Sequence, residues 1–201
     1  MNRLLCITTG LLATAFTVAG CTIPPAQENT GWIALIDGTT GLDNWGRIGD
    51  ANWRAQDNTI QADKKTGKPA GFLLSKNTYG DFQIKAEFWS SDDANSGIFI
   101  RCKDPGTLSA KTCYEVNIFD RRPDPKYGTG AIVDFAAVSP MPKAGGKWNT
   151  YEITAKGTHL TVILNGVRTA DIQDGTHARG PIALQYDGGI VKFRKLEIKP
   201  L

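Results

Sequence analysis

FQIKAEFW, residues 82–89, decides the fold class of this chain. Its even-numbered positions are all apolar, and three of its four odd-numbered positions carry glutamine, lysine and glutamate. Alternation with a period of two is typical of a half-buried β-strand, because successive side chains point to opposite faces of the sheet. The segment therefore predicts a strand with one face in a hydrophobic core.

The same alternation recurs along the chain on both sides of this strand. Residues 160–164 alternate and lead into Asn165-Gly166, a strong signal for a tight hairpin turn, with a partner strand to 172. An earlier hairpin is expected at 52–62, turning at Asp57-Asn58, and further strands at 71–75, 98–101, 114–119, 131–138, 148–155, 182–186 and 191–198. No segment has apolar residues at helical spacing over more than a turn or two. The chain is predicted to be all-β, a jelly-roll sandwich of two antiparallel sheets.

The first thirty residues are expected to direct export rather than to fold. Residues 1–20 combine a basic start with an uncharged apolar run, as in a signal peptide, and end on small residues before Cys21. We expect Cys21 to carry a lipid, residues 21–30 to act as a tether and residues 31–201 to form one β-sandwich domain. The alternative is an ordinary signal peptide with a chance cysteine. The residue after Cys21 is Thr22, so this chain resembles lipoproteins that lack an aspartate after the cysteine. The resemblance predicts a protein anchored in the outer membrane and facing the periplasm.

The remaining cysteines indicate a disulfide. Cys6 would leave with the signal peptide, so Cys102 and Cys113 are left as an even pair in an oxidising compartment. A metal or redox pair is the alternative, but the spacing is not that of a zinc site and no histidine lies nearby.

Charge and missing motifs exclude several classes of function. The net charge is +3, which is too small to predict nucleic-acid binding. The two histidines, His159 and His177, both adjoin turns and are expected at the surface, which disfavours a histidine-based triad. The chain has no phosphate-binding glycine loop and no dinucleotide fingerprint. Nothing in the sequence predicts an oligomeric state.

Arg101 ends the first candidate site segment, residues 95–101. It is expected to share a face with Gly97 and Phe99, where its guanidinium could hold a hydroxyl, a keto oxygen or a carboxylate. The alternative is a structural ion pair with Glu115 or Asp120.

Residues 114–120 carry the second candidate site. Glu115 and Asn117 point away from the apolar positions, and a bulge would bring Asp120 onto the same face. Paired carboxylates are what acid–base cleavage of a sugar bond needs, and the pattern is similar to the E-x-D-x-x-E strand of laminarinase-type glucanases. A solvated acidic strand face is the alternative.

A third set of side chains is expected to bind substrate. Gln185 and Asp187 end a predicted strand before a glycine turn, a place that suits binding residues. Trp148 could stack on a sugar ring, although core packing is its alternative role. Glu87 would line the same groove or face solvent.

Taken in order and spacing, several short segments resemble the 3-keto-disaccharide hydrolase domain family over Gly31 to Leu201. The segments are residues 42–45, 95–101, 114–120, 129–132, 146–153, 164–167, 179–185 and 193–194. The resemblance implies a concanavalin-like jelly roll and cleavage of glycosides oxidised to a ketone at C3. Many members have glutamine at position 117 and histidine at position 187. A carboxylate in place of that imidazole keeps a metal ligand but lacks a base titrating near neutral pH.

The family reaction needs a base, an acid and an electrophile that stabilises an enolate. We expect Glu115 and Asp120 to be base and acid, and Arg101 to be the electrophile. Asn117, Gln185 and Glu87 would orient hydroxyls. No cofactor is evident, and a divalent metal as the electrophile stays open without a defined ligand set.

Three functions compete at this point. The first is an exported hydrolase or lyase acting on 3-keto-glycosides, favoured by the ionisable residues Glu115, Asp120 and Arg101. The second is a non-catalytic, lectin-like carbohydrate-binding module, favoured by the missing histidine. The third is a structural envelope lipoprotein, which a closed set of ion pairs would favour.

Overall fold

The computed structural model describes residues 31–201, so the predictions for residues 1–20, Cys21 and the 21–30 tether lie outside the described residues. Thirteen strands form two antiparallel sheets, and two three-residue 3-10 turns, Leu42–Asn44 and Pro125–Tyr127, are the helical elements in this range. The predicted all-β jelly-roll sandwich is confirmed. Within residues 31–201, no helix is long and apolar enough to cross a membrane.

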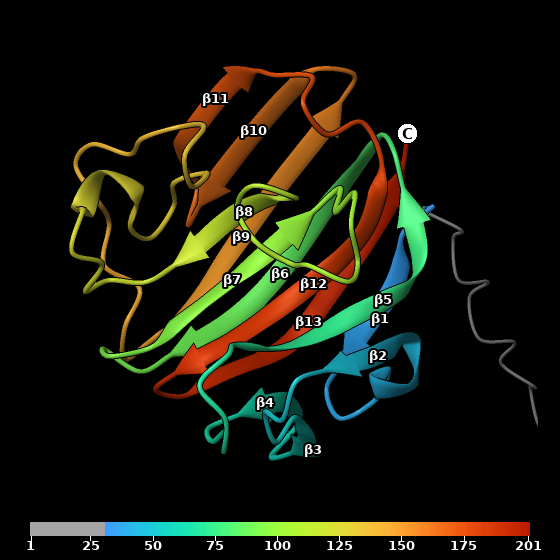
Figure 1. Cartoon of the computed structure of the whole chain (residues 1–201), viewed down its shortest axis with the longest axis vertical. Coiled ribbons are helices and arrows are strands. Elements are labelled where there is room, and N and C mark those ends of the chain that lie inside the picture. The colour runs from blue at the N-terminus through green and yellow to red at the C-terminus, as the bar shows by residue number, and fades with distance from the viewer. Residues whose placement is uncertain (1–30) are drawn as a thin grey trace, which may run out of the picture.

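The two sheets differ in size (Figure 1). The eight-stranded sheet runs in the order β11 (Val167–Gln173), β10 (His159–Leu164), β9 (Trp148–Lys156), β6 (Phe82–Ser90), β13 (Val191–Pro200), β4 (Thr59–Ala62) and β3 (Arg54–Gln56), and β1 (Ile33–Asp37) pairs with β13. The five-stranded sheet runs in the order β2 (Trp45–Ile48), β5 (Gly71–Tyr79), β12 (Gly180–Gly188), β7 (Asn95–Ile100) and β8 (Tyr114–Ile118).

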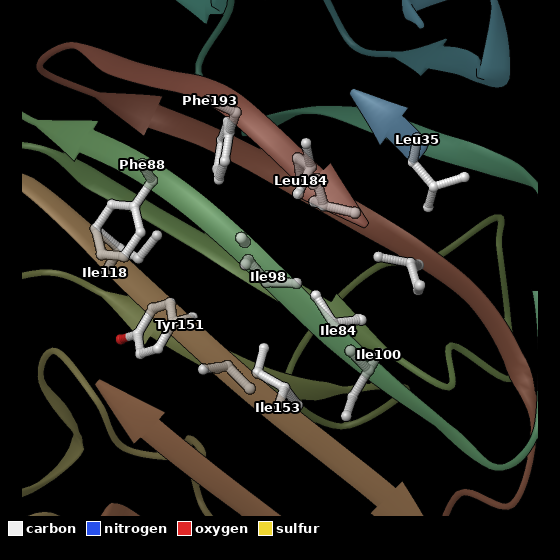
Figure 2. Packing of buried hydrophobic residues seen from close by; sticks show 14 of the residues in the cluster. Leu35, Ile84, Phe88, Ile98, Ile100, Ile118, Tyr151, Ile153, Leu184 and Phe193 are labelled. Carbon is white, nitrogen blue, oxygen red and sulfur yellow. The ribbon is translucent and has the colours of Figure 1, made fainter. Parts of the chain in front are cut away.

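The core lies between the sheets, where the apolar half of each alternating strand meets its counterpart. Ile84 and Phe88 of β6 extend from one sheet, and Ile98 of β7 and Leu184 of β12 from the other (Figure 2). All four are 0–1% exposed. Burial of these side chains is the main favourable term for such a fold, at about 1.5–3 kcal/mol for each. The opposite half of each strand is left for solvent or a ligand.

Most predicted strands are present, and one is not. Asn165 and Gly166 turn the β10–β11 hairpin with positive φ values of 52° and 80°, as the sequence predicts. Residues 131–138 do not form a strand. Asp134 has a φ of 65°, and the Ile132 and Ala136 backbones hydrogen-bond to each other, so the segment folds back as a turn.

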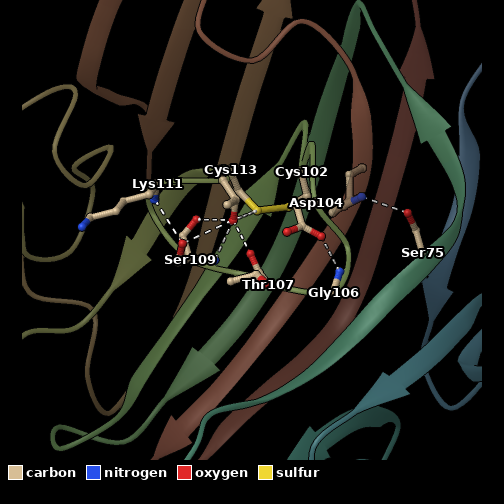
Figure 3. The surroundings of a disulfide bond; sticks show 10 residues. Ser75, Cys102, Asp104, Gly106, Thr107, Ser109, Lys111 and Cys113 are labelled. Carbon is tan, nitrogen blue, oxygen red and sulfur yellow. Dashed lines mark hydrogen bonds between the residues drawn. A yellow bond between two sulfur atoms is a disulfide. The ribbon is translucent and has the colours of Figure 1, made fainter.

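The predicted disulfide between Cys102 and Cys113 is confirmed, with a Cα–Cα distance of 4.2 Å. It closes the loop between β7 and β8, in which Thr112 and Ser109 hydrogen-bond across the turn (Figure 3). Both cysteines pack against Phe72, Phe99 and Ala183 in a small apolar cluster, separate from the main core. The loop therefore covers part of the outer face of the five-stranded sheet.

Candidate functional site

Four predicted site residues lie together on the outer face of the five-stranded sheet. The side chains of Tyr114, Val116 and Ile118 enter the core, so Glu115 and Asn117 of β8 point outward. Gln185 and Asp187 of β12 point to the same side, because residue 185 pairs with Gly97 and Gly97 pairs with Asn117. We call Glu115, Asn117, Gln185 and Asp187 the polar face.

Gly97 lies at the centre of the polar face because no side chain fits there. A Cβ at this position would lie 3.1 Å from the Val116 carbonyl oxygen and 3.4 Å from both Glu115 Cγ and the Phe99 ring. Any larger residue would press on β8 and stand between Gln185 and Asn117. Glycine leaves this part of the sheet open to a ligand.

Glu115 is the chemically distinctive residue of the polar face. It is 7% exposed, and within residues 31–201 its carboxyl group has no hydrogen bond or ion pair. Burial raises the pKa of this carboxyl to about 7, with smaller contributions from the charges of Asp134 and Asp187. A group that titrates near neutral pH can accept and release a proton in a reaction.

Two buried amide oxygens of the polar face also lack partners among residues 31–201. Asn117 donates from Nδ2 to the Tyr127 carbonyl at 2.6 Å, which leaves its Oδ1 unpaired, and Gln185 Oε1 is unpaired as well. A buried acceptor without a donor costs about 1–3 kcal/mol. Two such acceptors next to a carboxyl fit a ligand that brings several hydroxyl donors.

Asp187 is held in place by partners that the sequence did not indicate. Its carboxylate forms an ion pair with Lys65, and Asn95 Nδ2 donates to its other oxygen at 3.0 Å. Lys65 Nζ also donates to the Lys68 carbonyl at 2.7 Å, which ties the 63–70 loop to the end of β12. The Lys65–Asp187 ion pair therefore fixes the position of the Asp187 carboxylate at the edge of the polar face.

Arg122 is a second residue that the sequence analysis missed. It follows β8 in a loop, and its guanidinium has no hydrogen bond or ion pair with the described residues. Its positive charge lowers the pKa of Glu115, opposing the effect of burial. An unpaired guanidinium that acts on Glu115 is available to bind an anionic group near that carboxylate.

Arg101 does not lie where the sequence predicts. Its φ of 52° turns the chain at the end of β7, so the alternation of that strand no longer applies. The guanidinium is buried, pairs with Asp81 at 3.0 Å and donates to the carbonyls of Gly80, Gly157 and His177 at 2.8, 2.7 and 3.3 Å. These contacts correct the expectation of an electrophile: Arg101 joins three turns of the scaffold.

Asp120 is also occupied by structural contacts. Its Oδ1 accepts from Thr129 Oγ1 at 2.6 Å, and its Oδ2 accepts from the backbone N–H groups of Ala144 and Gly145, each at 2.9 Å. The carboxylate anchors the 119–145 loop. The predicted bulge that would pair Asp120 with Glu115 as an acid is therefore not supported.

Glu87 and Trp148 belong to the other sheet. Their core-facing neighbours put both on the outer face of the eight-stranded sheet, where Glu87 forms an ion pair with Arg194. The Arg194 guanidinium lies 4.3 Å from the centre of the Trp148 ring. The expected groove shared with Glu115 is wrong, because the core separates the two faces.

The histidines differ from each other. His159 is exposed and hydrogen-bonds to Asp171, but His177 is buried, contrary to the sequence expectation. The His177 ring packs against Tyr114 and Phe135, and neither ring nitrogen has a hydrogen-bond partner in the part of the chain that the structure describes. Burial lowers the pKa of this imidazole.

The described residues hold no group of three or more histidine, cysteine, aspartate or glutamate side chains that could bind a metal. Asp187, at the position where many family members have histidine, is engaged by Lys65. The side chains present in this range do not fit a metal centre.

A family model described as the 3-keto-alpha-glucoside-1,2-lyase-like domain matches residues 31–199. The match covers nearly the whole stretch over which the sequence resembles 3-keto-disaccharide hydrolases. Among curated proteins, none matches this chain.

Several solved structures share the fold. A glycosyl hydrolase candidate from Parabacteroides distasonis has a TM-score of 0.73 at 18% identity, covering 90% of this chain and 98% of its own. A galectin-like protein of unknown function from Bacillus subtilis has a TM-score of 0.62 at 11% identity, covering 82% and 92%. The carbohydrate-binding module CBM66 from Bacillus subtilis has a TM-score of 0.52 at 17% identity, covering 85% and 96%. At these identities the likeness establishes the fold alone.

Proposed function

The chain belongs to the 3-keto-alpha-glucoside-1,2-lyase-like domain family, and from that premise we propose that it cleaves glycosides carrying a ketone at C3. One observation carries the proposal: Glu115 is a buried carboxyl with a pKa of about 7 and no hydrogen bond or ion pair within residues 31–201, and it lies on a polar face that Gly97 leaves open. A carbohydrate-related role agrees with both the family and the structural neighbours.

The proposed reaction begins at the C2 proton of the sugar, which the neighbouring C3 ketone makes acidic. Glu115 in its ionised form takes this proton, and the electron pair of the C–H bond moves toward the C3 oxygen to form an enolate. The enolate then expels the C1 oxygen, which takes the proton back from the protonated Glu115, and leaves a C1–C2 double bond conjugated with the ketone. Water then adds across that bond, so the net reaction is hydrolysis. A base titrating near neutral pH suits the first step.

Arg122 replaces Arg101 in the proposed mechanism. Its unpaired guanidinium acts on the same region as Glu115 and would stabilise the negative charge that develops on the C3 oxygen. The unpaired oxygens of Asn117 and Gln185 would accept hydrogen bonds from sugar hydroxyls. Asp187, positioned by Lys65 and Asn95, would do the same at the border of the face.

The test is to incubate the purified protein with a 3-keto-disaccharide and with its unoxidised parent, and to follow products by NMR. Cleavage of the keto form alone supports the proposal. A parallel sample with EDTA asks whether a metal contributes. Cleavage of both forms would assign the protein to ordinary glycoside hydrolysis instead.

A lectin-like binding module is the second candidate, and the Lys65–Asp187 pair favours it, because the carboxylate at the position where many family members have histidine is already engaged by a lysine. Binding without cleavage in the same NMR samples would support this candidate. Absence of both binding and cleavage would favour the third candidate, a structural envelope lipoprotein.

For the location, we propose an exported protein, lipid-anchored at Cys21 to the outer membrane and facing the periplasm. The Cys102–Cys113 disulfide supports export, since such bonds persist in oxidising compartments. Metabolic labelling with a radioactive fatty acid should mark the wild-type protein and not Cys21→Ala. Equal labelling of the two would refute the anchor.

A further inference from the structure

A cavity of about 400 Å³ lies outside the polar face, between the 138–143 segment and the β10–β11 hairpin. Most of its wall is apolar, formed by Val138, Pro140, Met141, Pro142, Leu164 and Val167. Val167 is 65% exposed and adds an accessible apolar side chain to this wall. The volume and the apolar wall are typical of small-molecule sites.

The charged residues of the cavity are all of one sign. Lys143, Lys147 and Arg168 line it, and no aspartate or glutamate does. Arg168 is paired with Asp171, and Lys143 donates to the Asp120 carbonyl at 2.7 Å, but the Lys147 amine has no partner among residues 31–201. The wall therefore offers an apolar surface with an excess of positive charge at its edge.

The cavity is a separate place from the polar face. The 127–130 segment lies between them: the Tyr127 carbonyl accepts from Asn117 of the polar face, and a Cβ at Gly130 would lie 3.0 Å from Thr169 of the cavity wall. Gly130 has a φ of 91°, and its lack of a side chain allows this close approach. None of the four polar-face residues lines the cavity.

We propose that this cavity binds a small amphipathic organic anion, with its apolar body between the 138–143 segment and the β10–β11 hairpin and its carboxylate beside Lys147 and Arg168. Neutral apolar molecules would leave the amine of Lys147 without a counter-charge, and simple anions would not use the apolar wall. The apolar wall and the positive charge at its edge together favour a ligand with an apolar body and an anionic head group. This inference does not depend on the proposed reaction.

Octanoate is the probe, compared with octylammonium, which has the same chain and the opposite charge, and with acetate, which has the head group alone. Titrations of the full-length protein followed by calorimetry and by backbone amide NMR should show saturable binding of octanoate only. The amide shifts should concentrate in residues 138–143 and 164–169.

Charge reversal then tests the site. Lys147→Glu combined with Arg168→Glu should weaken octanoate binding at least about fivefold, since unlike charges at a binding site become like charges. Lys156→Glu is the control, because Lys156 is exposed at the far end of β9, the strand that begins directly after Lys147, and does not line the cavity. Equal binding of octanoate and octylammonium, no saturable binding, or the same loss in the control would overturn the proposal.

Discussion

Arg101 and Glu115 are both buried charged residues of the five-stranded sheet, and their surroundings are opposite. Arg101 is 1% exposed and has an aspartate and three backbone carbonyls as partners, whereas Glu115 is 7% exposed and has no hydrogen bond or ion pair within residues 31–201. A buried charge such as Arg101 stabilises the fold only while its hydrogen-bond and ion-pair partners are present. A buried carboxyl without partners destabilises the fold when it is ionised, and such perturbed groups are typical of functional sites.

The largest expected effect is on catalysis, from Glu115→Gln. The amide has nearly the same shape but cannot take a proton, so cleavage of a 3-keto-disaccharide should fall about 10²–10⁴-fold. Initial rates measured by NMR check this. Glu152→Gln, the same change at an exposed residue of β9 in the other sheet, is the matched control and should keep wild-type turnover. Unchanged turnover in Glu115→Gln would remove Glu115 from the mechanism.

Arg101→Leu should produce the largest loss of stability. Removing the guanidinium leaves the carbonyls of Gly80, Gly157 and His177 without this donor, two of them partly buried and one buried, and the free energy of unfolding should drop by about 3 kcal/mol. Urea denaturation followed by tryptophan fluorescence measures it. Arg168→Leu, an exposed arginine in an ion pair with Asp171, is the control and should change stability by less than about 1 kcal/mol. A similar loss of unfolding free energy in Arg101→Leu and Arg168→Leu would contradict the structural role of Arg101.

Glu115 should make the wild-type protein less stable as the pH rises. Its pKa is about 7 in the folded protein and 4.5 when unperturbed, so the unfolded chain releases the proton first between these values. Stability is fully present below pH 4.5, falls by up to about 3 kcal/mol as the pH rises to about 7, and then levels off. Urea midpoints between pH 4 and 9 should show this decline in the wild type and not in Glu115→Gln.

His177 should produce a smaller effect of the opposite sign. Burial lowers the pKa of its imidazole below the ordinary 6.5, so the unfolded chain binds the proton first as the pH falls. The groups around it are the rings of Tyr114 and Phe135 and the charges of Lys103 and Asp174. Stability should therefore decrease below pH 6.5 in the wild type.

Two variants isolate this slope. His177→Leu should flatten the decrease below pH 6.5, while His159→Gln should keep it, because His159 is exposed. An unchanged slope in His177→Leu would assign the acid sensitivity to other groups.

The sequence predicted the polar face better than the residues around it. The sequence predicted that Glu115 and Asn117, and separately Gln185 and Asp187, point away from the apolar side of their own strands, because the period of two applies there. That the two pairs share one face follows from the pairing of both strands with β7. Arg101 was misplaced because a positive φ interrupts the period at that residue. Lys65 and Arg122 were missed because both lie in loops, where no periodicity relates a residue to its neighbours in space.

Glu87 and Trp148 show a different limit. Their outward direction follows from the alternation of β6 and β9, but alternation is identical in both sheets of a sandwich. Which sheet a strand joins depends on pairing between distant segments, and β6 pairs with β9 and β13 rather than with β7.

By itself, then, the sequence determined the all-β class, the hairpin at Asn165-Gly166, the Cys102–Cys113 bond and the family, since these depend on local periodicity, turn chemistry and the count of cysteines. Only the tertiary structure decided which charged residues are satisfied and which are not. Burial and hydrogen bonding are properties of the packed chain: Arg101 becomes structural because three turns converge on it, and Glu115 acquires a pKa near 7 because the folded sheet removes it from water.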